Sequence, residues 1–81
     1  MKVYLLAYAM LKESFPQNPL AYELAENSTV EQLFQQLARD FPHAQGMLKC
    51  TRLAHADDYL DPQTQLKAEA EYCLIPPVSG G

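Results

Sequence analysis

Basic residues are scarce in this sequence. Six Lys and Arg stand against ten Asp and Glu, which gives a formal net charge of −4 over 81 residues. Proteins that bind nucleic acids draw most of their affinity from a basic face that neutralises phosphates, so the composition argues against a nucleic-acid partner. An acidic domain suits a basic protein partner better, and electrostatic attraction would speed their encounter.

Cysteine is also scarce, and no hydrophobic run is long enough for a membrane span. Cys50 and Cys73 lack metal or redox spacing, and a secreted disulfide scaffold of this size would usually carry more cysteines. The apolar stretch at residues 1–11 has no small-residue cleavage site, and it is shorter than the ~20 residues that cross a bilayer. We therefore expect a cytoplasmic protein with reduced cysteines and no membrane association.

No side-chain pattern indicates an internal active site or a metal centre. The two histidines have no cysteine or histidine at zinc spacing, the aspartates lack a calcium-loop pattern, and the serine is not in a Gly-x-Ser-x-Gly elbow. The cysteine in the last apolar strand is interpreted as a small core or interface residue. These candidates are His43, His55, Asp57, Asp58, Asp61, Ser79 and Cys73.

Apolar periodicity predicts a β-hairpin, one helix and one or two further strands. Residues 2–11 and 20–24 alternate as strands around a proline-containing loop. The sequence "STVEQLFQQLARDFP" carries an apolar stripe at helical spacing, after capping-box patterns at Ser28–Glu31 and Thr29–Gln32 and before Pro42. "RLAHA" could form a short strand, and "EYCLI" is a good final strand that Pro76 ends. Residues 43–51 remain ambiguous.

One helix has to bury its stripe on one face of a mixed sheet. The first and last strands are the most apolar, so we expect them side by side in the middle. The predicted fold is therefore α+β, a β-grasp (ubiquitin-like) sheet packed on one main helix. We assign residues 1–75 to this domain and residues 76–81 to an extended C-terminal tail.

The tail suggests a chemical role. Pro76 and Pro77 favour an extended path, and the six residues 76–81 can reach roughly 20 Å at about 3.3 Å each. Gly80 and Gly81 lack a Cβ, so they can pass a constriction that rejects any side chain. The terminal carboxylate is ionised at neutral pH and becomes reactive only when activated. Such an arm would present its carboxyl tip inside another protein's active site.

The ending "LIPPVSGG" resembles that of the MoaD/ThiS family of ubiquitin-like sulfur carriers, and especially of the MoaD-type small subunits of molybdopterin synthase. "KVYLLAYAMLKE" resembles the family's first strand, "STVEQLFQQLARDFP" its capped helix and "RLAHADDYL" its third-strand region. Two places depart from the pattern. Family members often have a Gly-Asp-Glu turn where this chain has Glu69, Ala70 and Glu71, and an asparagine where it has Ala56.

The resemblance implies a mechanism that centres on Gly81. A partner adenylyltransferase of the ubiquitin-activating type would use ATP to adenylate the Gly81 carboxylate, and a sulfurtransferase would then supply sulfur to form a thiocarboxylate. The large synthase subunit would receive the tail and supply the catalytic side chains, in a two-plus-two heterotetramer. The thiocarboxylate would donate sulfur to cyclic pyranopterin monophosphate for the molybdopterin dithiolene. The chain would itself be non-catalytic and bind no cofactor or metal. The tail residues are Pro76, Pro77, Val78, Ser79, Gly80 and Gly81.

Strand parity predicts the partner surface. If Val3, Leu5 and Ala7 face the helix, the alternate side chains of the first strand face away from it. A β-grasp with a single helix leaves that second sheet face uncovered, and uncovered apolar faces often bind partners. We therefore expect Leu6, Tyr59 and Ile75 at the interface with the large subunit.

Three other functions remain open at this stage. The chain could carry sulfur for thiazole or cysteine synthesis, although the Pro-Pro-Val approach favours the molybdopterin branch. It could be a non-covalent β-grasp interaction module, in which case deletion of Gly81 would leave function intact. It could also be a ubiquitin-like conjugator, which isopeptide-linked forms in cell extracts would reveal.

Overall fold

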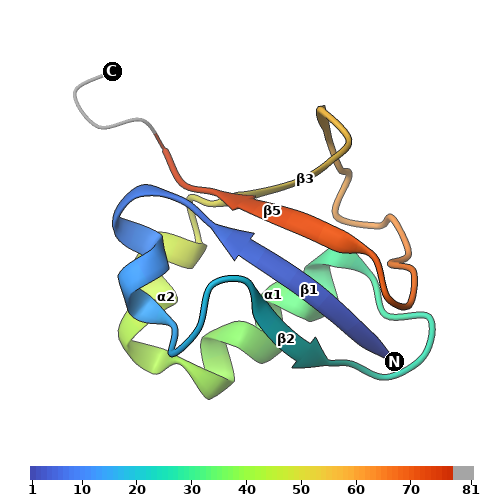
Figure 1. Ribbon diagram of the computed structural model, residues 1–81, viewed down its shortest axis with the longest axis horizontal. Helices are drawn as coiled ribbons and strands as arrows, with labels where there is room; N and C mark the ends of the chain where they lie inside the picture. The colour runs from blue at the N-terminus through green and yellow to red at the C-terminus, as the bar shows by residue number, and fades with distance from the viewer. Residues whose placement is uncertain (78–81) are drawn as a thin grey trace.

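A five-stranded mixed sheet forms the framework of the protein (Figure 1). In the computed structural model, which describes residues 1–77, the strand order is β2-β1-β5-β3-β4. β1 and β5 run parallel, and the other neighbouring strands are antiparallel. The expected adjacency of the first and last strands is confirmed. The strands are β1 (Lys2–Ala7), β2 (Leu20–Glu23), β3 (Arg52–His55), β4 (Asp58–Tyr59) and β5 (Glu71–Ile75).

The predicted main helix is α1 (Val30–Asp40), and its start shows which capping pattern forms. The Thr29 hydroxyl accepts a hydrogen bond from the Gln32 backbone N–H at 3.2 Å, and the Thr29 N–H donates to Gln32 Oε1 at 2.9 Å. This is a complete capping box. Ser28 is not the cap, because its hydroxyl donates to the Ala25 carbonyl oxygen at 2.7 Å.

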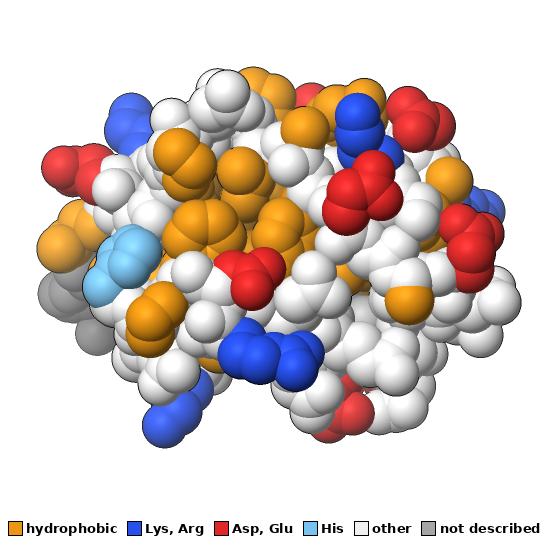
Figure 2. Space-filling view, turned by 90° about the horizontal axis from the view of Figure 1, so that it is seen from below, with side chains coloured by type: hydrophobic (Ala, Val, Ile, Leu, Met, Phe, Trp, Pro, Cys, Tyr) orange, Lys and Arg blue, Asp and Glu red, His pale blue; other side chains and the backbone are white. Residues whose placement is uncertain are grey.

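The core lies between α1 and one face of the sheet. Every second side chain of β1 and β5 points into it, as do three side chains of α1. A domain this small cannot enclose all its apolar atoms, and on the side seen from below in Figure 2 apolar side chains also gather at the surface among charged ones. The side chains of β1, β5 and α1 that point into the core are Val3, Leu5, Ala7, Tyr72, Leu74, Val30, Leu33 and Leu37.

The first strand is shorter than the apolar run predicted. It ends at Ala7, and residues Ala9–Ser14 form a 3-10 helix, η1, rather than a continued strand. The Asn18 side chain accepts from the Ala7 N–H at 2.8 Å and donates to the Ala7 carbonyl at 3.1 Å, so it replaces the backbone of β2 there. Turning the chain at this point brings Leu11 into the core, where it is fully buried.

The segment whose structure was ambiguous from sequence is helical. Residues Pro42–Ala44 form a 3-10 turn, η2, and Gln45–Leu48 form the short helix α2. Ala44 and Leu48 are buried there. α2 and η1 lie at the same end of the molecule, beside the end of β5 (Figure 1).

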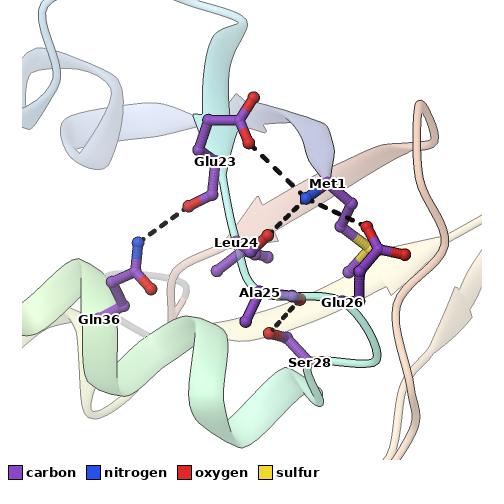
Figure 3. A network of polar contacts seen from close by, with 7 residues as sticks. All are labelled: Met1, Glu23, Leu24, Ala25, Glu26, Ser28 and Gln36. Atoms are coloured by element: carbon purple, nitrogen blue, oxygen red, sulfur yellow. Dashed lines mark hydrogen bonds and ion pairs between the residues drawn. The ribbon is translucent and has the colours of Figure 1, made fainter.

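Polar contacts extend the pairing of β1 with β2 and occupy one carbonyl on the outer edge of β2 (Figure 3). The Met1 amino group donates to the Leu24 carbonyl at 2.6 Å and lies 3.6 Å from a Glu23 carboxylate oxygen and 3.3 Å from one of Glu26. Gln36 of α1 donates to the Glu23 carbonyl at 2.9 Å. The outward-pointing Glu23 carbonyl is therefore occupied by α1 and cannot pair with a further strand, which limits edge-to-edge association at that position.

The two departures from the family pattern both fall at left-handed backbone positions. Ala56 has φ 50° in the turn between β3 and β4, and Glu69 has φ 65° just before β5. Glycine adopts this region freely and asparagine tolerates it, whereas other residues are strained there. The chain therefore keeps the turn geometry that glycine or asparagine would favour, with residues that fit it less well.

Candidate functional site

The tail begins at the end of a central strand. β5 is hydrogen-bonded to β1 on one side and β3 on the other, and it ends at Ile75. Pro76 is half-buried and Pro77 is exposed. The other predicted tail residues, including the proposed sulfur-carrying Gly81, lie outside the described residues. They are Val78, Ser79, Gly80 and Gly81.

The face of the sheet that points away from α1 carries the predicted interface residues, and we call it the open face. Leu6 and Ile75 are half-buried on it, on strands whose alternate residues are in the core. The register aligns Leu6 with Cys73, Cys73 with Ala54, and Ala54 with Tyr59. Neighbouring strands are about 4.8 Å apart, so this row spans roughly 14 Å. Leu6 and Tyr59 therefore share a face, but two strands separate them.

Arg52 is part of the open face, and the sequence interpretation missed it. Its guanidinium carbon lies 4.0 Å from the centroid of the Tyr59 ring, in a cation–π contact. It is also aligned with Ile75 across β3 and β5. Alternation along β3 places Arg52 and Ala54 on one face, but only the strand order brings that face beside Ile75. Tyr59 is 53% exposed, so the other side of its ring can receive a partner.

Tyr8 covers Cys73 at the end of the open face where the tail begins. Its hydroxyl lies 3.7 Å from the Cys73 sulfur. The hydrogen bond to Cys73, followed by the electrostatic effect of Cys73 and then by desolvation, raises the pKa of Tyr8 above its usual value. The hydroxyl is therefore neutral at physiological pH. Cys73 is half-buried and in no disulfide, in keeping with a small interface residue.

A mostly apolar pocket lies where the tail leaves the sheet. Its volume is about 450 Å³. Met10 is 67% exposed and Tyr8 44% exposed, which is unusual for large apolar side chains. Sequence reasoning missed the pocket because it assigned residues 9–11 to a strand, whereas η1 turns Met10 toward α2. We call it the methionine pocket, and its lining residues are Tyr8, Ala9, Met10, Met47, Ile75, Pro76 and Pro77.

Both candidate histidines lie within hydrogen-bonding distance of backbone carbonyl oxygens, and the Asp61 carboxylate accepts from the Gln63 N–H at 2.8 Å. A ring nitrogen of His43 lies 2.8 Å from the Ser14 carbonyl oxygen, and one of His55 lies 3.0 Å from that of Glu71. A larger cavity of about 680 Å³ beside α1 includes Thr51, whose hydroxyl donates to the Met47 carbonyl at 2.7 Å.

Within residues 1–77, no group of three or more His, Cys, Asp or Glu side chains could hold a metal ion. No helix in that same range is long and apolar enough to cross a membrane.

Solved structures share this fold. The crystal structure of SAMP1 from Haloferax volcanii superposes with a TM-score of 0.82 at 18% identity, covering 100% of both chains. A Helicobacter pylori 26695 structure, the protein–protein complex of subunits 1 and 2 of molybdopterin-converting factor, gives a TM-score of 0.65 at 21% identity and also covers 100% of both chains. At these identities the likeness shows the ubiquitin-like β-grasp fold.

Sequence comparison identifies the family. Two relatives are molybdopterin synthase sulfur carrier subunits. The protein from Chlamydomonas reinhardtii is 30% identical, covering 100% of this chain and 100% of its own length. The one from Arabidopsis thaliana is 25% identical, covering 99% of this chain and 83% of its own length. Residues 9–81 match the ThiS family. The protein therefore belongs to the ThiS family of MoaD/ThiS-type sulfur carriers.

Proposed function

We propose that this protein is the sulfur-carrying small subunit of molybdopterin synthase, and that Gly81 carries the sulfur. The observation that supports this best is the full-length similarity to the Chlamydomonas reinhardtii sulfur carrier subunit. The match to the ThiS family also runs through residue 81 and so includes the Gly-Gly ending.

The proposed chemistry takes place at the Gly81 carboxyl group. A carboxylate oxygen attacks the α-phosphorus of ATP in a partner adenylyltransferase, and pyrophosphate leaves. A sulfur nucleophile supplied by a sulfurtransferase then attacks the carbonyl carbon, and AMP leaves. The sulfur of the resulting thiocarboxylate attacks cyclic pyranopterin monophosphate in the large synthase subunit, and water then cleaves the thioester so formed, which leaves the sulfur on the substrate and restores the Gly81 carboxylate. ATP is thus bound by the partner, and this chain binds no cofactor of its own.

Three features of the described residues support a carrier rather than a catalyst. The His and Thr side chains that could act as bases or nucleophiles are engaged with backbone carbonyls. The strand that leads into the tail is held on both sides by neighbours. The open face presents Leu6, Tyr59 and Ile75, which we propose contact the large subunit. We further propose that these reactions take place in the cytoplasm.

The intact mass of the protein tests this function. The protein is purified from cells that contain its native activating enzyme, alongside a variant that lacks Gly81. We expect a species heavier by one sulfur-for-oxygen exchange, located at Gly81 by fragmentation and absent from the variant. The loaded protein should then convert cyclic pyranopterin monophosphate when the large subunit is added. An unmodified carboxylate, even with ATP, activating enzyme and sulfur donor supplied, would contradict the proposal and favour a non-covalent interaction module.

A further inference from the structure

Exposed apolar side chains are concentrated where the tail starts. The large hydrophobic side chains that are exposed within residues 1–77 are Tyr8, Met10 and Tyr59, and the first two line the methionine pocket. The pocket joins three parts of the chain that are distant in sequence: the start of η1, α2 and the end of β5. Figure 1 shows these segments at one end of the molecule, where β5 ends.

The length of the tail determines what must cover this pocket. Pro77 lines it, and only residues 78–81 separate Pro77 from the carboxyl group of Gly81. Four residues span at most about 13 Å when fully extended. A protein that encloses Gly81 in its active site therefore has to bring the rim of that site to within this distance of Pro77. The residues around Pro77, above all Met10, then lie against that rim.

We propose that the methionine pocket receives an apolar side chain from the large subunit of molybdopterin synthase. This proposal depends on the proposed function, because it names a contact that the sulfur-transfer complex would use. Ile75 lines the pocket and also lies on the open face, so the pocket and the proposed large-subunit interface form one continuous surface. That continuity is the reason for choosing the large subunit over the adenylyltransferase.

The pocket's side chains suit such a contact. Methionine is unbranched and polarizable, so Met10 and Met47 can adjust to the shape of an inserted side chain. Tyr8 adds a large amphipathic surface at low entropic cost, as aromatic residues commonly do at interfaces. The pocket carries no ionisable group except the Tyr8 hydroxyl, so an apolar occupant would not strand a charge.

The test measures the affinity of the isolated large subunit for the full-length carrier and three variants. Met10→Glu places a charge in the pocket, and Met10→Leu keeps it apolar. Gln63→Glu makes the same charge change at an exposed residue between β4 and β5, outside the pocket. We expect Met10→Glu to raise the Kd about tenfold or more, because one buried methionine contributes on this scale. The other two variants should stay within about threefold of the wild type.

Thermal unfolding shows whether Met10→Glu is folded, which its exposure of 67% favours. If it is not, Met10→Gln replaces it in the comparison. Wild-type affinity in the folded variant would overturn the proposal, and so would a loss confined to adenylyltransferase binding or shared equally by Gln63→Glu. Failure of the proposed function looks different: the wild type itself would neither bind the large subunit nor acquire a thiocarboxylate, and both proposals would then fall.

Discussion

Leu74 and Ile75 are adjacent in β5 but lie in opposite environments, so replacing each with alanine should separate stability from partner binding. Leu74 is 0% exposed and points into the core against α1. Ile75 is half-buried on the open face, aligned with Arg52. The pair differs by one position along one strand, which makes each variant a control for the other.

The expected magnitudes follow from these environments. Leu→Ala in a fully buried site costs about 3–5 kcal/mol, because a cavity remains after the side-chain atoms are removed. A domain typically has about 5–15 kcal/mol of total stability, so Leu74→Ala should be strongly destabilised but still folded in the absence of denaturant. Ile75→Ala should lose about 1 kcal/mol, since its side chain is only partly buried. Its affinity for the large subunit should fall about tenfold, as is common for an apolar residue in an interface.

Urea unfolding and titration with the large subunit measure the two effects. Leu74→Ala should shift the urea midpoint strongly and leave the affinity of its folded fraction unchanged, whereas Ile75→Ala should shift the midpoint only slightly and weaken the affinity. If Ile75→Ala binds like the wild type, the open face is not the partner surface near the tail. If Leu74→Ala loses affinity beyond its unfolded fraction, the two faces of β5 are not independent, and the parity argument is wrong.

Two further predictions concern the fold. The Tyr22 hydroxyl donates to Asp40 Oδ2 at 2.6 Å, and burial, followed by this hydrogen bond, raises the pKa of Tyr22. Tyr22→Phe should cost about 1–2 kcal/mol of unfolding free energy at pH 7. Because the pKa of Tyr22 is raised on folding, this stabilisation is lost as the pH rises above the unfolded pKa of about 10. If the wild type loses no more stability than the variant above pH 10, the linkage is refuted. Ala56→Gly and Glu69→Gly should each leave thermal stability unchanged or raise it by up to about 1 kcal/mol, since relief of the left-handed strain outweighs the backbone entropy of glycine, and a clear loss in calorimetry would contradict that explanation.

The elements with strong periodicity could be predicted from the sequence, and those governed by distant contacts could not. The stripe of α1 and the alternation in β5 each identify their own secondary structure. The apolar run after Ala7 looks like more strand, but the backbone groups of Ala7 bond to the Asn18 side chain, from the loop before β2, in place of a strand partner. Likewise, both capping patterns before α1 are plausible locally. The Ser28 hydroxyl instead bonds to Ala25, so the cap is Thr29.

The candidate site likewise has features that the local sequence predicts and features that depend on distant contacts. Parity within a single strand correctly predicted that Leu6 and Ile75 point away from α1. It could not bring Arg52 over the Tyr59 ring, because that contact depends on the order of β3, β4 and β5 in the sheet. Met10 was missed for a related reason. Its position depends on η1, whose first three residues continue the apolar run of β1 and so were assigned to that strand.

The Gly-Gly ending makes the surface around β5 necessary for the proposed function. Glycine has no side chain, so Gly80 and Gly81 can enter a narrow site but offer a partner little apolar area to bind. Affinity and specificity therefore have to come from residues close to the start of the tail. β5 places Ile75 there, one residue before the proline at which the strand's hydrogen bonding ends. Because β5 is held by β1 and β3 on either side, a partner that grips this surface also fixes where the tail begins.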